Sequence, residues 1–309
     1  MGKLAFIYPG QGAQKVGMGK DFYEKSESAR QIYDLAEEVL DFSVKQICFE
    51  ENEKINNTAY TQAALVTTCL AMTAELLTYG IVPQGSAGLS LGEYAAICAA
   101  EGMSVKDAIL LVRKRGILMN EAVPEGEGAM AAVLGLEKEQ VEAGIAGIDG
   151  VSIANYNCPG QIVITGSKEA VLSAEEPLKA QGAKRVMQLK VSGPFHSPYL
   201  KEAAKKLSKE LDQVELKPLR FPYVTNVTAE YVTDIADTKE LLTEQICSSV
   251  RWEQSMRRMI ADGFTTFVEI GPGKTLSGFM KKIDKTVTMY HVSQYEDVAQ
   301  VAAALKEAE

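Results

Sequence analysis

The chain has 309 residues, of which 46% are hydrophobic and 24% charged, and its formal net charge is −9 at pH 7. This length predicts one large or two smaller globular domains, and the negative charge argues against binding to nucleic acid or to a membrane surface. The five cysteines are scattered and form no Cys-x-x-Cys pair, so we expect neither a disulfide framework nor a metal site. With no N-terminal signal segment, a cytoplasmic protein is expected.

The first part of the chain places a short apolar strand before longer helical segments, as in an α/β fold. Residues 3–8 predict a buried strand, and residues 9–14 a glycine-rich loop whose backbone N–H groups can approach a ligand. A tight turn is the alternative, and Lys15 stands where a dinucleotide-binding fingerprint needs glycine. Helices are predicted over residues 21–40 and 60–79, and polar residues inside the second argue against a membrane span.

A Gly-x-Ser-x-Gly frame centred on Ser90 comes next. Turn-forming residues precede it and helix formers follow it, which is the layout of a nucleophile elbow, where a strand turns sharply into a helix. Gly88 and Gly92 leave room for the close approach of strand, helix and substrate, and the N-terminus of the helix favours developing negative charge. The alternative is a plain loop, because the pattern by itself is weakly specific.

The following helix is predicted over residues 104–120, with Ser104 as its N-cap. Its end carries three neighbouring basic residues, Arg113, Lys114 and Arg115. Charges at this position usually offset the helix dipole, and this reading accounts for at least two of the three.

A break in composition at residues 124–128 is followed by a segment with a different order of predicted strands and helices. Helices are expected at 138–146 and 168–181, and strands at 129–134, 151–155, 161–165 and 184–189. This β-α-β-β-α-β order is that of a ferredoxin-like unit. We therefore predict a large α/β-hydrolase-like domain with a parallel sheet, formed by residues 1–125 and 197–309, and a small ferredoxin-like α+β domain inserted at residues 126–196.

The last third of the chain supplies the groups that could activate a serine. The expected helices are 199–211, 239–249 and 297–306, and the expected strands are 223–226, 267–270 and 287–291. A serine needs a neighbouring base, most naturally histidine, and the chain has two histidines. His291 lies in an apolar strand pattern, where histidine is more often structural, whereas His196 lies on a loop, where catalytic groups concentrate. We therefore favour His196 as the base.

Several weak motifs follow one another in a specific order along nearly the whole chain. They are Pro9-Gly10-Gln11-Gly12, residues 88–94, Arg115-Gly116, residues 155–161, residues 193–198, Glu244-Gln245 with Val250-Arg251-Trp252, and residues 269–274. In this order they resemble the malonyl-CoA:acyl carrier protein transacylases of bacterial fatty-acid synthesis. Each motif is weak alone, but together they are highly specific.

The resemblance implies a nucleophile, a base and two anion sites. Ser90 would attack the malonyl thioester and carry the acyl group, while His196 would take the serine proton and return it to the departing thiol. The backbone N–H groups of Gln11 and Leu91 would form the oxyanion hole, where loss of one donor typically slows a reaction about 100- to 1,000-fold. Arg115 would hold the free malonyl carboxylate through two parallel hydrogen bonds.

Three further residues take roles from the same resemblance. Gln245 corresponds to the polar residue that orients the catalytic histidine and serine, and a neutral amide there should leave the imidazole less basic than a carboxylate would. Phe195 resembles the version that prefers malonyl over methylmalonyl groups, and Asn155 is expected to bind substrate. Leu89 departs from the family, because many members have histidine before the serine, and the change bears on acyl selectivity.

The resemblance also implies ping-pong transfer from malonyl-CoA to the phosphopantetheine arm of acyl carrier protein, without metal or cofactor. Carrier proteins in this role are acidic, so a local positive surface is expected near the cleft. Its candidate residues are Lys184, Arg185, Lys190, Lys274, Lys281 and Lys282. The alternatives are a serine thioesterase or esterase, which would usually have an acidic third member, an acyltransferase of a polyketide pathway, and a non-catalytic carrier-docking module.

Overall fold

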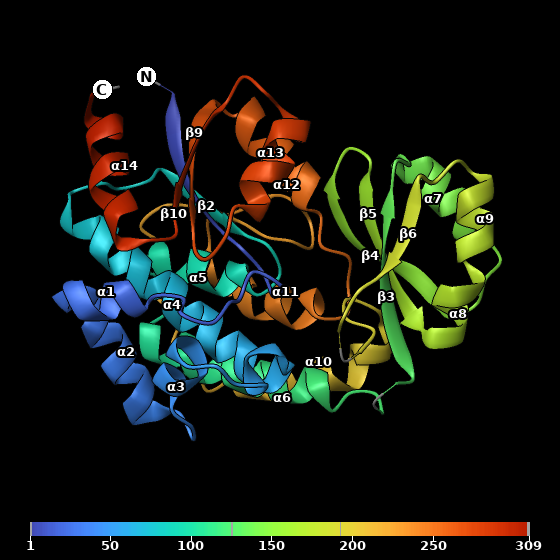
Figure 1. The fold of residues 1–309 in the computed structure, drawn as a ribbon, viewed down its shortest axis with the longest axis horizontal. Helices are drawn as coiled ribbons and strands as arrows, with labels where there is room; N and C mark the ends of the chain where they lie inside the picture. The colour runs from blue at the N-terminus through green and yellow to red at the C-terminus, as the bar shows by residue number, and fades with distance from the viewer. Residues whose placement is uncertain (1, 125, 192, 308–309) are drawn as a thin grey trace.

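The computed structural model describes residues 2–124, 126–191 and 193–307, which form two separate sheets with helices packed against them (Figure 1). Strands from both the first and the last third of the chain build the large sheet, whereas the small sheet comes from the stretch between them. The chain therefore leaves the large sheet and later returns to it. The predicted domain boundary at residue 125 lies outside the described residues.

The large sheet has six strands in the order β10-β9-β1-β2-β7-β8, all parallel to their neighbours except β8 at one edge. Its strand β1 is buried on both faces, because Phe6 and Tyr8 enter one apolar cluster while Ala5 and Ile7 enter another. The strands are β1 (Lys3–Tyr8), β2 (Gly85–Gly88), β7 (Tyr223–Val224), β8 (Tyr231–Val232), β9 (Phe264–Ile270) and β10 (Thr288–Val292).

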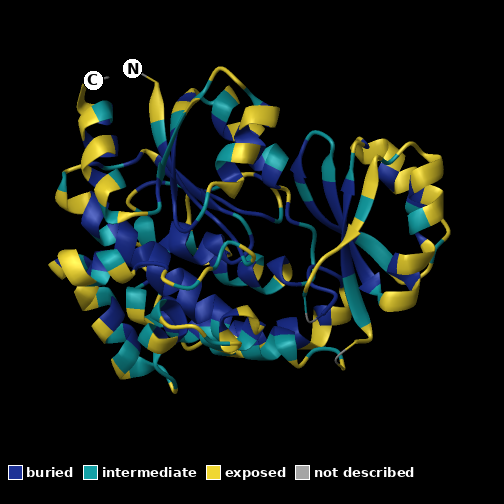
Figure 2. Ribbon diagram, viewed as in Figure 1, coloured by how far each residue is buried: buried dark blue, intermediate teal, exposed yellow. Residues whose placement is uncertain are grey.

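Helices cover both faces of this sheet, with α12 and α13 on one face and α4, α5 and α6 on the other (Figure 1). Figure 2 shows the buried strands and inner helices enclosed by helices whose outer faces are exposed. The helices are α1 (Lys20–Lys25), α2 (Glu27–Val39), α3 (Val44–Phe49), α4 (Thr58–Thr78), α5 (Gly92–Ala99), α6 (Val105–Asn120), α10 (Lys201–Leu211), α11 (Thr238–Gln245), α12 (Trp252–Ala261), α13 (Thr275–Ile283) and α14 (Tyr295–Glu307), with short 3₁₀ turns η1 (Lys54–Asn56), η2 (Pro198–Leu200) and η3 (Ile235–Asp237).

The capped helices α4 and α6 pack against each other and carry side chains to the site described below. Asn57 caps α4, and Ser104 caps α6 by accepting the backbone N–H of Asp107, as predicted. A Cβ on Gly116 would lie 2.6 Å from the Thr58 carbonyl oxygen, so glycine permits the close approach of α6 to α4.

The small sheet is antiparallel, with the order β4-β5-β3-β6 that the ferredoxin-like prediction requires. Helices α7, α8 and α9 pack on the face that holds its apolar cluster. The elements are β3 (Gly128–Leu134), α7 (Lys138–Ile145), β4 (Val151–Cys158), β5 (Gln161–Ser167), α8 (Lys168–Ser173), α9 (Glu175–Ala180) and β6 (Arg185–Gln188). Backbone hydrogen bonds from Tyr156 N to Val250 O (2.9 Å) and from Val250 N to Ala154 O (2.7 Å) join β4 to the segment before α12.

Two predicted helices are divided. The helix predicted at 21–40 is two helices, because Ser26 has an extended backbone (φ −116°, ψ 125°) and its side chain caps α2. The helix predicted at 168–181 breaks at Ala174, because Pro177 lacks the N–H that would bond to the carbonyl four residues earlier.

Two other predicted elements end early, at residues that turn toward the site. The helix predicted at 239–249 ends at Gln245, and the strand predicted at 223–226 ends at Val224. Polar groups at or just after these ends turn to the site instead: the Gln245 carbonyl bonds to His196, and the Asn226 side chain bonds to Ser90. Helices α3 and α13 and strand β8 were not predicted.

Candidate active site

Ser90 stands in a sharp turn between β2 and α5, the strand–turn–helix layout predicted for it. Its φ of 52° lies in the left-handed region that residues with side chains rarely adopt. A Cβ on Gly88 would lie 1.9 Å from the Gly92 carbonyl carbon, and one on Gly92 would lie 2.3 Å from the Tyr8 oxygen. The two flanking glycines are therefore required by the geometry of the turn.

Asn226, just beyond β7, holds this turn from the neighbouring strand. Its Nδ2 donates to the Gly88 carbonyl at 2.7 Å, and its Oδ1 accepts the Ser90 N–H at 2.6 Å. Both contacts are buried, so they fix the strained backbone on either side of Leu89. The sequence offered one signal for this residue: a polar side chain at the carboxyl end of a predicted strand, where α/β proteins bind ligands.

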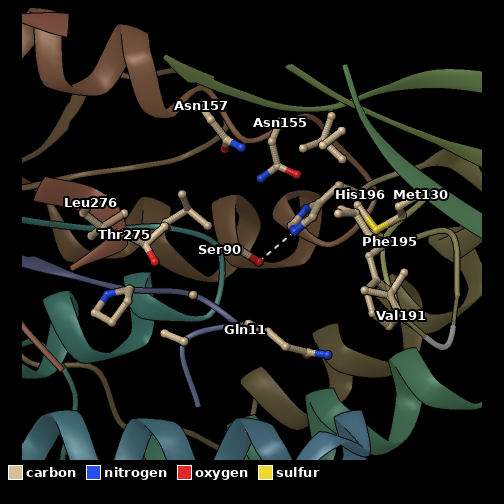
Figure 3. Close-up of a pocket in the computed structure, with 18 of the residues that line it drawn as sticks. Gln11, Ser90, Met130, Asn155, Asn157, Val191, Phe195, His196, Thr275 and Leu276 are labelled. Atoms are coloured by element: carbon tan, nitrogen blue, oxygen red, sulfur yellow. Dashed lines mark hydrogen bonds between the residues drawn. The ribbon is translucent and has the colours of Figure 1, made fainter. Parts of the chain in front are cut away.

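His196 lies beside Ser90 although 106 residues separate them in the chain (Figure 3). Its Nε2 is 2.7 Å from Ser90 Oγ, and its Nδ1 is 2.9 Å from the Gln245 carbonyl oxygen. A carbonyl can only accept, so Nδ1 carries the proton and Nε2 is left to accept the serine O–H. Burial, together with the nearby Arg115 charge, lowers the pKa of His196 to about 4, so the imidazole is neutral at pH 7.

Arg115 projects from α6 into the same buried region and is 1% exposed. Its Nη2 donates to Ser90 Oγ at 3.1 Å and to Gln245 Oε1 at 2.9 Å, and its Nη1 donates to Gln62 Oε1 at 2.8 Å. Its neighbour Arg113 points elsewhere and pairs with Asp41 on the surface. Of the three neighbouring basic residues in α6, Arg115 is thus the one turned toward Ser90. The helix continues to Asn120 and has no basic residue in its last turn, so the expectation that these charges offset the dipole at its end is wrong.

The Gln245 side chain was expected to orient His196, but the contact between these residues is made by the Gln245 backbone. The contact to His196 comes from the backbone carbonyl at the end of α11, where helix carbonyls lack intrahelical partners. The side chain donates from Nε2 to the Ser90 carbonyl (2.9 Å) and to Glu93 Oε2 (2.7 Å). Gln245 therefore contacts both His196 and Arg115, the two side chains that hydrogen-bond to Ser90 Oγ.

The two expected oxyanion donors are the N–H of Leu91, within the elbow, and that of Gln11, in the loop after β1. In the turn itself the N–H groups of Ser90, Gly92, Glu93 and Tyr94 are already bonded, and no described residue accepts that of Leu91. The loop with Gln11 follows β1 and comes close because Gly10 leaves space: a Cβ there would lie 2.5 Å from the Leu89 oxygen. No described residue accepts the Gln11 N–H either.

A pocket of about 370 Å³ opens over Ser90, between the two sheets. Six of the predicted site residues line it, namely Gln11, Ser90, Arg115, Asn155, Phe195 and His196. Gln245 lies behind them, and the side chain of Leu91 packs in the core. Met130 and Val191 lie near Phe195, and Leu276 lies on the other side of Ser90 (Figure 3). The other apolar side chains that line the pocket include Leu89, Met119, Val163 and Phe279.

Three polar residues of the site were missed by sequence reasoning. Glu93 lies within the elbow motif, Asn226 is the last residue of the predicted strand 223–226, and Gln62 belongs to the predicted helix 60–79, but the sequence assigned none of them a role. Gln62 carries no distinguishing sequence signal, because α4 contains several other buried polar residues. His291, by contrast, lies on the edge strand β10 opposite Glu269, outside the pocket.

The described ranges contain no group of three or more His, Cys, Asp or Glu side chains that could hold a metal ion. Within the same ranges, no helix has the length and apolar character needed to cross a membrane.

This fold and site are those of enzymes that transfer acyl groups through an activated serine, and comparison with known proteins narrows the class. The family model of the acyl transferase domain matches residues 5–304. Malonyl CoA-acyl carrier protein transacylase from Bacillus subtilis (strain 168) is 46% identical, with 99% of this chain and 98% of that protein covered. The chain belongs to the malonyl-CoA:acyl carrier protein transacylase family of acyl transferases.

Solved structures agree with this assignment. A crystal structure of malonyl CoA-acyl carrier protein transacylase from Clostridium perfringens has a TM-score of 0.95 and 41% identity, with 99% of this chain and 98% of that chain covered. A malonyl-transacylase solved in complex with a type II PKS acyl-carrier protein has a TM-score of 0.95 and 35% identity, with 98% and 99% covered.

Proposed function

We propose that this chain transfers the malonyl group of malonyl-CoA to the phosphopantetheine thiol of acyl carrier protein through a malonyl-Ser90 intermediate. One observation carries the proposal: Ser90 Oγ lies within hydrogen-bonding distance of both a neutral imidazole and a buried guanidinium, at 2.7 and 3.1 Å. The imidazole supplies a base for the serine, and the guanidinium supplies a partner for an acyl group that carries its own carboxylate. The names of full-length relatives support the same reaction.

In the first half-reaction His196 Nε2 takes the Ser90 proton as Oγ attacks the thioester carbonyl carbon. The carbonyl oxygen becomes an oxyanion, which the N–H groups of Gln11 and Leu91 stabilise. When the carbon–sulfur bond breaks, His196 returns its proton to the departing coenzyme A thiolate. A low imidazole pKa suits this step, because a weakly basic imidazole gives its proton up readily.

The second half-reaction repeats these steps in reverse, with the carrier thiol as nucleophile and Ser90 as the leaving group. His196 then deprotonates the incoming thiol and finally reprotonates Ser90. Entering and leaving groups are both thiols, so one base serves both directions. Its Nδ1 partner is a neutral carbonyl, the Gln245 oxygen at 2.9 Å, whereas a hydrolase would usually have a carboxylate there. This contact favours transfer over the thioesterase alternative.

Arg115 binds the malonyl carboxylate. The direct partners of its Nη1 and Nη2 are the neutral side chains of Gln62, Gln245 and Ser90, so an acyl group with a terminal carboxylate supplies the charged partner within the pocket. Phe195, 6% exposed and lining the pocket, limits its width near the acyl group and favours malonyl over methylmalonyl. Asn155, which also lines the pocket, contributes an amide to substrate binding.

The proposal requires two substrates and neither metal nor cofactor. The five cysteines are all free thiols, which supports a reducing compartment, and we assign the chain to the cytoplasm. We also retain the predicted division into a large domain of residues 1–125 and 197–309 and a small one of residues 126–196. The basic rim that would receive an acidic carrier includes Lys190 at the pocket and Lys281 and Lys282 at the end of α13.

A two-substrate kinetic experiment tests the proposal. Initial rates of malonyl transfer are measured while malonyl-CoA and phosphopantetheinylated acyl carrier protein are both varied. Parallel double-reciprocal lines are expected, because each substrate meets a different form of the enzyme. Intersecting lines, or release of free malonate in place of transfer, would contradict it.

A polyketide carrier is the second candidate acceptor, since one structural relative was solved with a type II PKS acyl-carrier protein. The same assay with carriers of both pathways separates the two candidates by their kcat/KM values.

A further inference from the structure

Glu93, in the first turn of α5, is completely buried beside the site, and none of the transfer steps uses it. Its Oε2 accepts hydrogen bonds from Gln245 Nε2 at 2.7 Å and from the Asn226 backbone N–H at 3.1 Å. Burial raises the pKa of Glu93 to about 7, because a carboxylate without access to water loses its hydration. A buried acid at this cost calls for a function.

The contacts of Glu93 determine which end of the Gln245 amide faces which neighbour. Two N–H groups converge on Glu93 Oε2, so this oxygen acts as an acceptor and any proton resides on Oε1. Gln245 Nε2 also donates to the Ser90 carbonyl, another group that can only accept. Both contacts require the NH₂ end of the Gln245 amide, so its oxygen must face the other way.

On that other side Gln245 Oε1 accepts from Arg115 Nη2 at 2.9 Å, and the same nitrogen donates to Ser90 Oγ at 3.1 Å. If the amide were reversed, its NH₂ group would face a guanidinium that can only donate. Gln62 fixes the second nitrogen, Nη1, at 2.8 Å. The direction in which Arg115 points therefore depends on the orientation of Gln245, and that orientation depends on Glu93 together with the Ser90 carbonyl.

We propose that Glu93 is a positioning residue for recognition of the acyl carboxylate: as an obligate acceptor it sets the Gln245 amide, which aims Arg115 at Ser90. This inference rests on the proposed function. It predicts that Glu93 matters for malonyl, which needs the guanidinium, and much less for acetyl, which does not.

The test compares acylation by malonyl-CoA and by acetyl-CoA in two variants. Glu93→Met removes the acceptor at similar length, and we expect the malonyl-to-acetyl ratio of kcat/KM to fall at least about tenfold, the effect of one lost charge-assisted hydrogen bond. Glu93→Gln keeps an oxygen for the same two donors and should hold the ratio within about threefold of wild type. Equal loss of both acyl groups in Glu93→Met, or a Glu93→Gln ratio as low as that of Glu93→Met, would overturn the inference.

A second experiment uses Gln245→Met to test whether Glu93 acts through the Gln245 amide. If Glu93 acts through this amide, adding Glu93→Met to Gln245→Met leaves the ratio unchanged, whereas an independent role lowers it further. Gln245→Met also decides the question should Glu93→Met fail to fold: a selective loss of malonyl supports the chain of contacts, and a uniform loss contradicts it.

Glu75 provides the matched control, because it is another buried acid, 7% exposed, that bonds to Ser26 and Ser28 on the far side of α4. Glu75→Met should lower the melting temperature without changing the ratio. Wild-type malonylation is measured in the same series. Its absence would contradict the proposed function itself, whereas normal wild-type transfer with an unselective Glu93→Met variant would contradict only the inference.

Discussion

His196 donates its Nδ1–H to the backbone carbonyl of Gln245 across 2.9 Å, at the point where α11 ends. The early end of that helix makes the contact possible, because a carbonyl inside a longer helix would bond to its own turn. The partner is neutral and the ring is buried, so nothing holds a positive charge on the imidazole. The base is thus tuned for rapid proton return.

The pH dependence of acylation follows from this contact. Burial, and then the Arg115 charge, lowers the pKa of His196 to about 4. The imidazole accepts a proton only when neutral, so activity is present above that pKa and is lost as the pH falls through it. Rapid-quench acylation rates should stay flat from pH 8 to about pH 5 and then decline. An acidic limb centred near the ordinary histidine value, about 6.5, would show that the ring is not desolvated.

Replacing Arg115 with alanine separates malonyl transfer from general serine chemistry. Malonyl transfer should fall at least about 100-fold, as expected when one partner of a buried ion pair is removed. Slow acetyl transfer should persist or rise. Arg113→Ala is the control, since that neighbouring guanidinium pairs with Asp41 outside the pocket and should leave both rates unchanged. A fall of equal size for both acyl groups in Arg115→Ala would exclude the carboxylate contact.

Asn226→Ala should slow acylation about tenfold or more with little change in KM. The side chain bonds to Gly88 and Ser90 on both sides of the strained turn, and without it the serine loses its fixed geometry. Thermal unfolding should also report a loss of about 1–3 kcal/mol, because two buried backbone groups lose their partner. Full activity in a destabilised variant would mean that Asn226 supports the fold but not the position of Ser90.

Charge reversal on the rim should affect only the second half-reaction. Arg185, Lys281 and Lys282 are exposed, and changing them to glutamate should raise the carrier-protein KM about tenfold or more while sparing acylation by malonyl-CoA. The control is Lys306→Glu on α14, which lies at the opposite end of the molecule from the small sheet (Figure 1). If both half-reactions weaken together, the rim does not serve carrier docking.

The sequence predicted the parts of the site that depend on local pattern. The elbow can be predicted because only glycines fit at the positions that flank Ser90 and Leu91. His196 can be predicted as the base because the chain has only two histidines. Arg115 could be singled out by resemblance but not by pattern, since three basic residues follow one another in its helix. The two helix breaks are local as well: Ser26 and Pro177 carried the signals.

The contacts of Glu93, Asn226 and Gln62 could not be predicted in the same way. Each lies far in sequence from its main partner, so no periodicity records the pairing: Asn226 and Ser90, for example, are 136 residues apart. The orientation of the Gln245 amide is likewise a property of the assembled network, because it follows from acceptors on two different elements.

The central claim is that one serine carries the acyl group between two thiols, and trapping that intermediate tests it most directly. Brief mixing with malonyl-CoA, followed by intact mass measurement and peptide mapping, should find a single malonyl group on Ser90 and none in Ser90→Ala. A label on any other residue, or an equal label in Ser90→Ala, would contradict the account.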